Sequence, residues 1–496
     1  MQRAEILYIL TKYERAHAVD TYKAFGWHAW PLMRILAAYR ALQTPFPAGM
    51  DRGPVSSPTP APPIATRIRQ YFDRFQEGGA DALADAVILT SSGYRIRTDR
   101  CYYDVFSDPL RELLRRHDMN TIVWEHGGTS VPRCSSSARI SPILGTLMSS
   151  TAARGPLQQP VWFGDYQELT GCLCNEPLDW PSLEQQILHL QQRSLLFEQW
   201  LRRAGARLLV NVCWYDPIAM AATLAARRCG IPAIDYQHGL QDESHIAYVG
   251  WDRAPAGGFE LVPDFFWCWG ENQAERLHRA NPAFERHSAT LAGGFQWFNL
   301  CRAGEMPFLS KEFKEARRHF ANDSRIILVT LQKNTDFHAP IIAAMAFSPP
   351  EWRWLVRFHR GSDEAEKAAL RILYRKEGGG RAEFGLANEC ALYTLLRFAD
   401  VHVTGHSTCC LEALGFGVPT VTVSKEGRRA FRSLIEQGVV FHAENEGALL
   451  AGINALAAVA AQRCRDTVET TFAPASAGDA ALRTLLAAVR DRRGTA

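Results

Sequence analysis

Residues 399–423, ADVHVTGHSTCCLEALGFGVPTVTV, contain a turn whose groups could hold a phosphate. An apolar run, Val401–Thr404, predicts a strand, the turn Gly405–Thr408 follows it, and apolar periodicity predicts a helix over 409–416. Free backbone N–H groups and the dipole at a helix N-terminus attract anions. Glu412 lies one turn further along. The segment therefore indicates a nucleotide site, with a diphosphate at the turn and a ribose near the carboxylate. The alternative is a turn whose hydroxyls only cap the helix.

Two other strand ends carry a histidine followed by a glycine, in WEHGG (124–128) and YQHGL (236–240). Glycine allows a turn with close backbone approach, and histidine accepts a proton near neutral pH. His238 is the first candidate for a catalytic base. His126 is the second, with Glu125 either orienting its imidazole or acting as the base itself. The alternative for each histidine is a buried ring bonded to a backbone carbonyl.

A basic cluster, VRFHR, ends a strand in the C-terminal half of the chain. Arg357, His359 and Arg360 would form a clamp for phosphate, because a guanidinium donates two parallel bonds to an oxyanion. The alternative is a solvated strand end.

Four histidines lie at strand ends: His126, His238, His359 and His406. They are spaced too widely for a local metal motif, and the sequence has no HExxH or DxD. GxGxxG, GxxxxGK[ST] and GxSxG are also absent. The sequence therefore predicts no metal and no cofactor.

Strands alternate with helices from Ala86 to Trp269 and again from Lys311 to Arg490, whereas 129–180 is loop-rich. This pattern predicts an α/β protein of two Rossmann-like domains facing each other across a cleft. The expected divisions are an N-terminal helical segment with a proline-rich linker, an N-terminal domain and a C-terminal domain, at 1–66, 67–300 and 301–496.

Length and composition agree with a two-domain globular protein, at 496 residues, 47% hydrophobic and 22% charged. A net charge of +3 gives no reason to expect nucleic acid as a partner. The apolar run near the N-terminus, 6–10, is too short for a signal peptide or a membrane span. Twelve cysteines without a framework spacing are expected to be reduced, so a cytoplasmic location is predicted.

The chain resembles the glycosyltransferases of two Rossmann-like domains (GT-B type), particularly bacterial enzymes of capsule and lipopolysaccharide (surface polysaccharide) assembly. The segment at 399–423 carries the resemblance, supported by DYQHGLQ (235–241) and PDFFWCWGE (263–271), over about 205–300 and 325–445. The family implies an acceptor domain followed by a nucleotide-sugar donor domain. It places donor binding on Gly405, His406, Ser407, Thr408 and Glu412.

VRFHR also resembles the basic-His-Pro motif of bacterial sialyltransferases, with Arg360 in place of the proline. The resemblance implies a CMP-linked acidic sugar such as Kdo or sialic acid, with UDP- and GDP-sugars as alternatives. The expected reaction is metal-independent transfer to a surface polysaccharide or glycolipid, with Arg357 and His359 stabilising the departing phosphate.

Two alternatives to transfer are a UDP-sugar 2-epimerase, which has the same two-domain fold, and a non-catalytic scaffold that binds nucleotide or glycan. The stretches WPLMRILAAYRAL and LRTLLAAVRDRR could also lie peripherally on the cytoplasmic face of the inner membrane, although packing within the protein is favoured.

Overall fold

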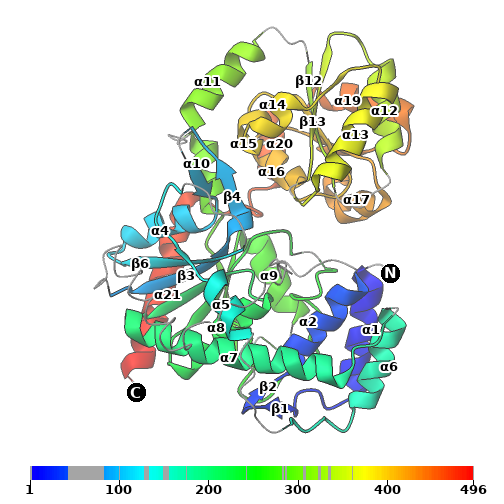
Figure 1. Ribbon diagram of the computed structural model, residues 1–496. Coiled ribbons are helices and arrows are strands. Elements are labelled where there is room, and N and C mark those ends of the chain that lie inside the picture. Colours follow the sequence, from blue (N-terminus) through cyan, green and yellow to red (C-terminus); the bar gives the residue numbers. More distant parts are fainter. Residues whose placement is uncertain are drawn as a thin grey trace, which may run out of the picture. The chain divides into compact units, whose positions relative to one another are not determined.

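The computed structural model describes residues 3–42, 83–99, 101–127, 133–148, 156–174, 176–241, 243–281, 284, 287–304, 309–321, 325–332, 337–359 and 361–494. These residues form two compact units (Figure 1). Unit 1 comprises Met1–Arg95, Tyr102–Gln296 and Pro474–Ala496, and unit 2 comprises Ile96–Cys101 and Trp297–Ala473.

Unit 1 is built on a parallel sheet of seven strands in the order β11-β10-β9-β8-β3-β6-β7. Its central strands are continuous apolar runs, as expected where helices cover both faces of a parallel sheet. The strands are β3 (Ala86–Ser91), β6 (Thr121–His126), β7 (Ala138–Arg139), β8 (Leu208–Val212), β9 (Ala233–Tyr236), β10 (Phe265–Cys268) and β11 (Ala289–Ala292).

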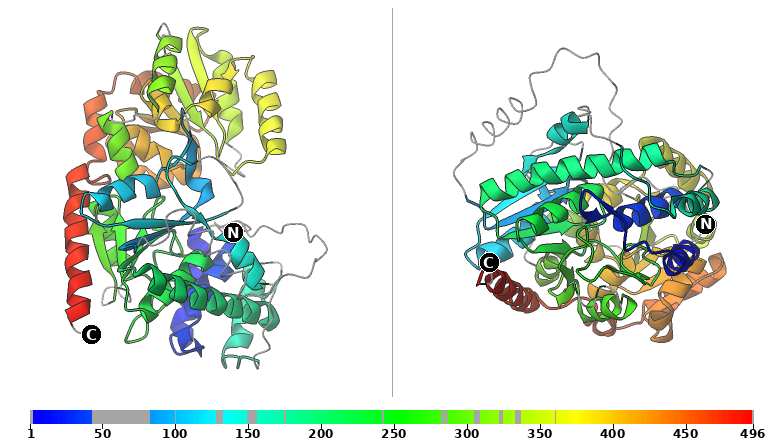
Figure 2. Two further views of the ribbon diagram at one scale, coloured as in Figure 1. Left: turned by 60° about the vertical axis from the view of Figure 1, so that its left-hand side comes forward. Right: turned by 90° about the horizontal axis from the view of Figure 1, so that it is seen from below.

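The longest helix of unit 1, α7 (Trp180–Ala204), runs along the sheet (Figure 2). Asp179 caps its start by accepting a hydrogen bond from the N–H of Ser182, and Gly205, with φ of 63°, ends it. The other helices are α1 (Arg3–Ala16), α2 (Trp30–Ala41), α4 (Ser107–Arg115), α5 (Ser141–Met148), α6 (Phe163–Leu173), α8 (Pro217–Arg228), α9 (Glu271–Ala280) and α21 (Ala475–Gly494), with the 3-10 turn η1 (Ser92–Tyr94). The remaining short strands are β1 (Lys23–Ala24), β2 (Trp27–His28), β4 (Arg95–Arg97) and β5 (Tyr102–Asp104).

The N-terminal helices α1 and α2 belong to unit 1, whereas the sequence analysis set 1–66 apart as a separate segment. A buried ion pair, Arg34 on α2 with Glu14 on α1, joins the two helices, and both side chains are fully buried. The Arg34 guanidinium also donates to the carbonyls of Val249 and Gly250. The proline-rich linker lies outside the described residues.

Unit 2 is built on a parallel sheet of six strands in the order β14-β13-β12-β15-β16-β17. The strands are β12 (Arg325–Thr330), β13 (Trp352–Arg357), β14 (Ala382–Glu383), β15 (Val401–Thr404), β16 (Thr420–Thr422) and β17 (Val440–His442). The helices are α10 (Gln296–Ala303), α11 (Ser310–His319), α12 (His338–Phe347), α13 (Glu364–Glu377), α14 (Gly385–Glu389), α15 (Leu392–Leu396), α16 (Cys409–Gly415), α17 (Lys425–Ala430), α18 (Arg432–Glu436), α19 (Glu446–Leu456) and α20 (Ala461–Thr467).

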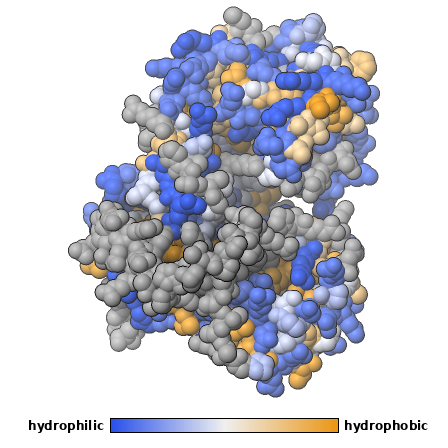
Figure 3. Space-filling view, viewed as in Figure 1, coloured by the Kyte–Doolittle hydropathy of each residue, from blue (hydrophilic) through white to orange (hydrophobic). Residues whose placement is uncertain are grey.

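The surface of unit 2 in Figure 3 is mostly hydrophilic, with an apolar patch toward α12 and α13. Phe347 on α12 and Ile372 on α13 are exposed apolar side chains of unit 2.

The final helix differs from the expected division, which ended the C-terminal domain at residue 496. Residues from Pro474 onward belong to unit 1, because α21 packs against β11 and α4. Asp479 on α21 accepts a hydrogen bond of 2.9 Å from the ring of His117.

The cysteines also differ in part from expectation: ten are free, whereas Cys101 and Cys134 are disulfide-bonded.

Candidate functional site

The turn Gly405–Thr408 lies at the point where the strand order of unit 2 reverses. Numbered along the chain, its six strands lie in the order 3-2-1-4-5-6, with β12 first and β15 fourth. The connections from these two neighbouring strands leave toward opposite faces, which opens a crevice beyond their carboxyl ends, where ligands bind in sheets of this kind. The predicted turn follows β15 directly, so the topology places it at this crevice.

The backbone at Gly405 is held closely by side chains from two neighbouring strands. The amide oxygen of Gln332, just beyond β12, accepts a hydrogen bond of 2.7 Å from the N–H of His406. The Thr422 hydroxyl, at the end of β16, donates to the carbonyl of Gly405. A Cβ at Gly405 would lie 2.5 Å from the Gln332 oxygen and 2.6 Å from the Phe337 ring. Glycine is therefore required here by close packing.

The hydroxyls of the turn differ in what they do. Ser407 Oγ accepts a hydrogen bond of 3.2 Å from the N–H of Cys409, so the capping alternative describes Ser407 in part. Thr408 precedes α16 in helical conformation, with φ of −54° and ψ of −24°, and its side chain makes no capping bond. The Thr408 hydroxyl is thus available to another group.

Glu412 lies on α16 and accepts a hydrogen bond from the Tyr393 hydroxyl. Tyr393 is buried, with its ring stacked on Trp297 at 6.2 Å and tilted against Phe416 at 5.0 Å. Burial, together with the Glu412 carboxylate, raises the pKa of Tyr393 well above its usual value, so the phenol remains a donor to Glu412. The Glu412 carboxylate is therefore held in one orientation. Glu412 itself is only half-buried.

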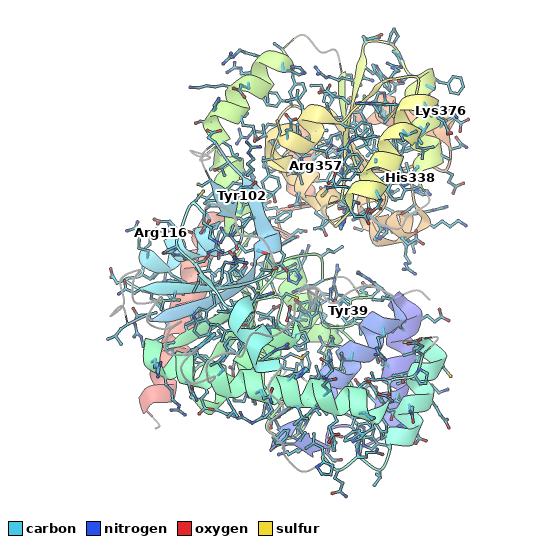
Figure 4. The ribbon with its side chains drawn as sticks, viewed as in Figure 1. Tyr39, Tyr102, Arg116, His338, Arg357 and Lys376 are labelled. Atoms are coloured by element: carbon cyan, nitrogen blue, oxygen red, sulfur yellow. The ribbon has the colours of Figure 1, made fainter. Side chains whose placement is uncertain are left out.

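The residues of the predicted phosphate clamp make different contacts. Arg357, labelled in Figure 4, donates from Nη1 to the carbonyls of Ala387 and Cys390, at 2.7 and 2.6 Å, which ties β13 to α14. His359 is exposed, and its Nδ1 accepts a hydrogen bond of 3.0 Å from the N–H of Gly361. Arg360 lies outside the described residues.

In unit 1, Glu125 and His126 do not form the expected pair. Successive side chains of a strand point to opposite faces of its sheet, so neighbours in sequence are separated by the sheet itself. Glu125 is 2% exposed and forms ion pairs with Arg95 and with Arg133, the latter at 2.7 Å, using both oxygens. Its carboxylate therefore ties β6 to the segments that carry Arg95 and Arg133.

His126 is 4% exposed, and its Nδ1 has no hydrogen-bond partner among the described residues. Burial lowers the pKa of His126, with Asp216 opposing the effect and Arg193 adding to it. The glycine that follows, Gly127, adopts φ of +111°, and a Cβ there would lie 2.2 Å from the Ser92 hydroxyl oxygen. The expected tight turn is present at this strand end.

His238 follows β9 and is surrounded by aromatic rings. The Tyr215 hydroxyl lies 3.3 Å from His238 Nε2, and the Tyr94 ring lies 5.9 Å away between centroids. Burial lowers the pKa of His238 to about 4, so the imidazole is neutral at pH 7. Its Nδ1 has no partner among the described residues. A neutral ring with an unused nitrogen is suited to accept a proton.

Residues that the sequence did not single out hold the segment that carries Tyr215. Asp235 accepts hydrogen bonds from the N–H of Trp214 at 2.9 Å and from the Tyr248 hydroxyl at 2.8 Å. Burial raises the pKa of Asp235 to about 7. These bonds hold the segment after β8, where Cys213 adopts φ of 80°, a conformation that non-glycine residues rarely adopt. The only signal in the sequence was the position of Asp235 inside DYQHG.

The same segment presents Tyr215, whose ring stacks on Tyr39 with centroids 5.7 Å apart. Figure 4 labels Tyr39, which comes from α2. An N-terminal helix thus contributes to the surroundings of His238, which no spacing in the sequence indicated.

Two general features of the described residues bear on the site. No group of three or more His, Cys, Asp or Glu side chains among them is arranged to hold a metal ion. No single described helix is long and apolar enough to cross a membrane. Helices α19 and α20, bent by 102° at their junction, reach that length and apolar composition only when taken together. The metal-independent reaction stays a prediction.

Comparisons with known proteins give relatives in structure only. No family model matches the sequence, and no curated protein does so either. The UDP-GlcNAc 2-epimerase of Neisseria meningitidis, solved with UDP-GlcNAc, has a TM-score of 0.50 at 11% identity, covering 81% of this chain and 99% of its own. A putative UDP-N-acetylglucosamine 2-epimerase of Listeria monocytogenes scores 0.48 at 13% identity, covering 83% and 98%. The wall teichoic acid polymerase TagF scores 0.45 at 11% identity, covering 87% and 95%.

At such low identity the likeness to the Neisseria enzyme establishes the fold alone. The chain has the α/β fold of two Rossmann-like domains, of the GT-B type, as the sequence predicted.

Proposed function

We propose that this protein is a glycosyltransferase that moves a sugar from a nucleotide-sugar donor to a surface polysaccharide or glycolipid. The observation that supports this most is the turn Gly405–Thr408 at the reversal point of the unit 2 sheet. A Rossmann-like sheet with a glycine-containing, hydroxyl-bearing turn at this point is suited to a nucleotide.

In this proposal the donor lies along the carboxyl ends of β12 and β15. The Thr408 hydroxyl would bind the diphosphate, since a hydroxyl donates to oxyanions. Glu412, oriented by Tyr393, would accept hydrogen bonds from the ribose hydroxyls. His359, exposed just beyond β13, would approach the leaving phosphate. Arg357 would keep the end of β13 in place through its hydrogen bond to α14.

The acceptor would bind at unit 1, with its hydroxyl directed at His238. The imidazole takes the hydroxyl proton as the oxygen forms its bond to the anomeric carbon. The bond between that carbon and the phosphate oxygen breaks, and the nucleotide leaves with the electron pair. Tyr215 holds the ring, and Glu125 is assigned to positioning through its ion pairs with Arg95 and Arg133. A cytoplasmic location, peripheral to the inner membrane for a glycolipid acceptor, belongs to this proposal.

A UDP-sugar 2-epimerase is the second candidate, favoured by the fold shared with the Neisseria enzyme bound to UDP-GlcNAc. The two activities differ in a simple requirement. Transfer releases the nucleotide only when an acceptor is present, whereas epimerisation inverts C2 of a UDP-sugar without one.

Nucleotide binding at the turn is tested by Thr408→Val, which removes the hydroxyl and keeps the side-chain shape. Because Thr408 makes no capping bond, we expect folding to be unaffected. Losing a hydrogen bond to a charged phosphate costs roughly 1.5–3 kcal/mol, so affinity should fall about tenfold or more. Calorimetry with the nucleotide that most raises the melting temperature, among CMP, CDP, UDP and GDP, measures this.

Thr467→Val, on α20 of the same unit, is the matched control and should bind like the unaltered protein. Equal affinity of the Thr408→Val protein would place the nucleotide elsewhere, and no stabilisation by any of the four nucleotides would contradict the donor site itself. With nucleotide-sugars, acceptor-independent change at C2 would favour the epimerase.

A further inference from the structure

Unit 2 contains a cavity of about 860 Å³ beyond the carboxyl end of its edge strand β17. It is lined by α17 and α18 on one side and by the end of β17 and the start of α19 on the other. Strand β16 lies between β15, which carries the predicted donor turn, and β17. We call this cavity the basic pocket, after Lys425, Arg428, Arg429 and Arg432, which line it.

The basic pocket carries more positive than negative charge. Two carboxylates, Glu436 and Glu444, line it beside the four cations, which leaves a formal excess of two positive charges (four minus two). Arg428 pairs with Glu444 and Arg432 with Glu436, each at 3.0 Å. Lys425 and Arg429 form no ion pair with any residue that the structure describes.

The two cations without ion-pair partners among the described residues, Lys425 and Arg429, are unfavourably spaced on α17. Lys425, Arg428 and Arg429 are separated by three and four residues on α17, so their side chains share one face of the helix. Like charges at this spacing repel each other and destabilise a helix. An anion in the cavity removes that repulsion, which gives the arrangement a physical reason.

The rest of the lining supports the same ligand. His442, at the end of β17, has only 10% of its side chain exposed and lines the cavity. Burial, and after it the nearby Arg428 charge, lower the pKa of His442, while Glu444 opposes them. Asn445 caps α19, an eleven-residue helix whose positive end faces the cavity.

We propose that the basic pocket binds a phosphate-bearing polyanion, such as a diphosphate or phosphomonoester group, separate from the nucleotide at Gly405–Thr408. Several cations around one space match a multiply charged phosphate group better than a single carboxylate, which one arginine would satisfy. The proposal stands independently of glycosyl transfer, because it rests on the charge and shape of the cavity alone.

The pocket is also linked to the turn through Gly427 on α17. A Cβ at Gly427 would lie 2.0 Å from the Gly405 carbonyl oxygen and 1.9 Å from the Thr422 hydroxyl oxygen. The helix that carries the cations is therefore packed directly against the backbone of the predicted donor turn.

Calorimetry with inorganic pyrophosphate tests the site on the full chain. The double variant Lys425→Ala/Arg429→Ala removes the two cations without ion-pair partners, and we expect its affinity to fall about tenfold or more. The matched control, Arg375→Ala/Lys376→Ala on α13, removes the same charge from an exposed helix of the same unit and should bind within about twofold. Circular dichroism checks that both variants are folded.

Three outcomes would overturn the proposal: unchanged affinity in the pocket variant, equal weakening in the control, or no binding of pyrophosphate by the unaltered protein. The Thr408→Val protein separates this site from the donor turn, because it should keep its pyrophosphate affinity. If Thr408→Val abolishes that binding and the pocket variant does not, the phosphate lies at the turn and the pocket proposal is wrong.

Vesicles distinguish the two sources of such a phosphate. Sedimentation with phosphatidylglycerol vesicles that fails for the pocket double variant, and that pyrophosphate inhibits, would identify a lipid headgroup. Absence of sedimentation, with pyrophosphate binding intact, would identify a soluble phosphate ligand. Vesicle binding that is equal in the two double variants would show charge attraction alone and would contradict the site.

Discussion

At the scale of single residues, His238 shows how its surroundings set its chemistry. Burial favours the neutral imidazole, and the Tyr215 hydroxyl, 3.3 Å away, fixes the ring. His126 is buried more deeply and lies beside Asp216 and Arg193. Of the two histidines, His238 is therefore the better candidate for the base, because the residue is partly exposed whereas His126 is buried.

His238→Ala should leave the fold intact and lower turnover by roughly 10²–10⁴-fold, the range of a lost general base. The measurement is acceptor-dependent release of the nucleotide. The control is His278→Ala, an exposed histidine on α9 of the same unit, which should keep full activity. Turnover near that of the unaltered protein would remove His238 from the mechanism.

The pH profile of the same reaction tests the lowered pKa. Only the neutral ring accepts a proton, and a pKa of about 4 keeps the ring neutral well below its usual value. Activity should therefore hold down to about pH 5 and decline as the pH falls through about 4, in contrast to the midpoint near 6.5 of an exposed histidine. A decline centred near 6.5 that vanishes in His238→Ala would contradict this prediction.

At the scale of elements, α1 and α2 are joined by one buried ion pair whose two partners also bind the rest of unit 1. Glu14 accepts hydrogen bonds from the Trp30 indole N–H at 2.8 Å and from the N–H of Asp252 at 3.0 Å, as well as from Arg34. The Arg34 guanidinium lies 4.3 Å from the centre of the Trp251 ring. Both charges are thus compensated on several sides, as burial requires.

Arg34→Met should destabilise unit 1 by about 3–5 kcal/mol, because it leaves the Glu14 carboxylate buried without its partner. Urea denaturation followed by tryptophan fluorescence measures the change. The control is Arg15→Met on α1, where the arginine of the ion pair with Asp252 is exposed, and its effect should be far smaller. Equal effects of the two substitutions would show that burial of the pair is not what matters.

At the scale of the whole molecule, the order of the chain does not match the division into units. The chain completes unit 2 at Ala473, and its last helix, α21, belongs to unit 1. Leu482 and Leu485, each 1% exposed, are the buried side chains at the centre of that helix. A Cβ at Gly478 would lie 3.2 Å from the carbonyl of Gly293, so the start of the helix is also closely packed.

Leu482→Ala should therefore destabilise unit 1 by about 2–5 kcal/mol, the usual effect of removing a buried leucine side chain. Hydrogen exchange by mass spectrometry should show faster exchange in β10 and β11 and little change in β12 and β15. Leu449→Ala, on α19 in the unit 2 core, is the matched control and should give the reverse pattern. Faster exchange confined to unit 2 in Leu482→Ala would contradict the assignment of α21.

The sequence by itself determined the two Rossmann-like sheets, because apolar β-branched runs alternating with amphipathic helices leave few other arrangements. It also located the turn at Gly405 and the histidine at 238, since glycines and polar groups at strand ends are visible as local patterns. Only the tertiary structure decided which residues meet. Glu125 and His126 are adjacent in sequence but lie on opposite faces of a sheet, whereas Gln332, just beyond β12, accepts a hydrogen bond from the N–H of His406 after β15. Such contacts depend on strand order and on long-range packing, which local spacing does not encode.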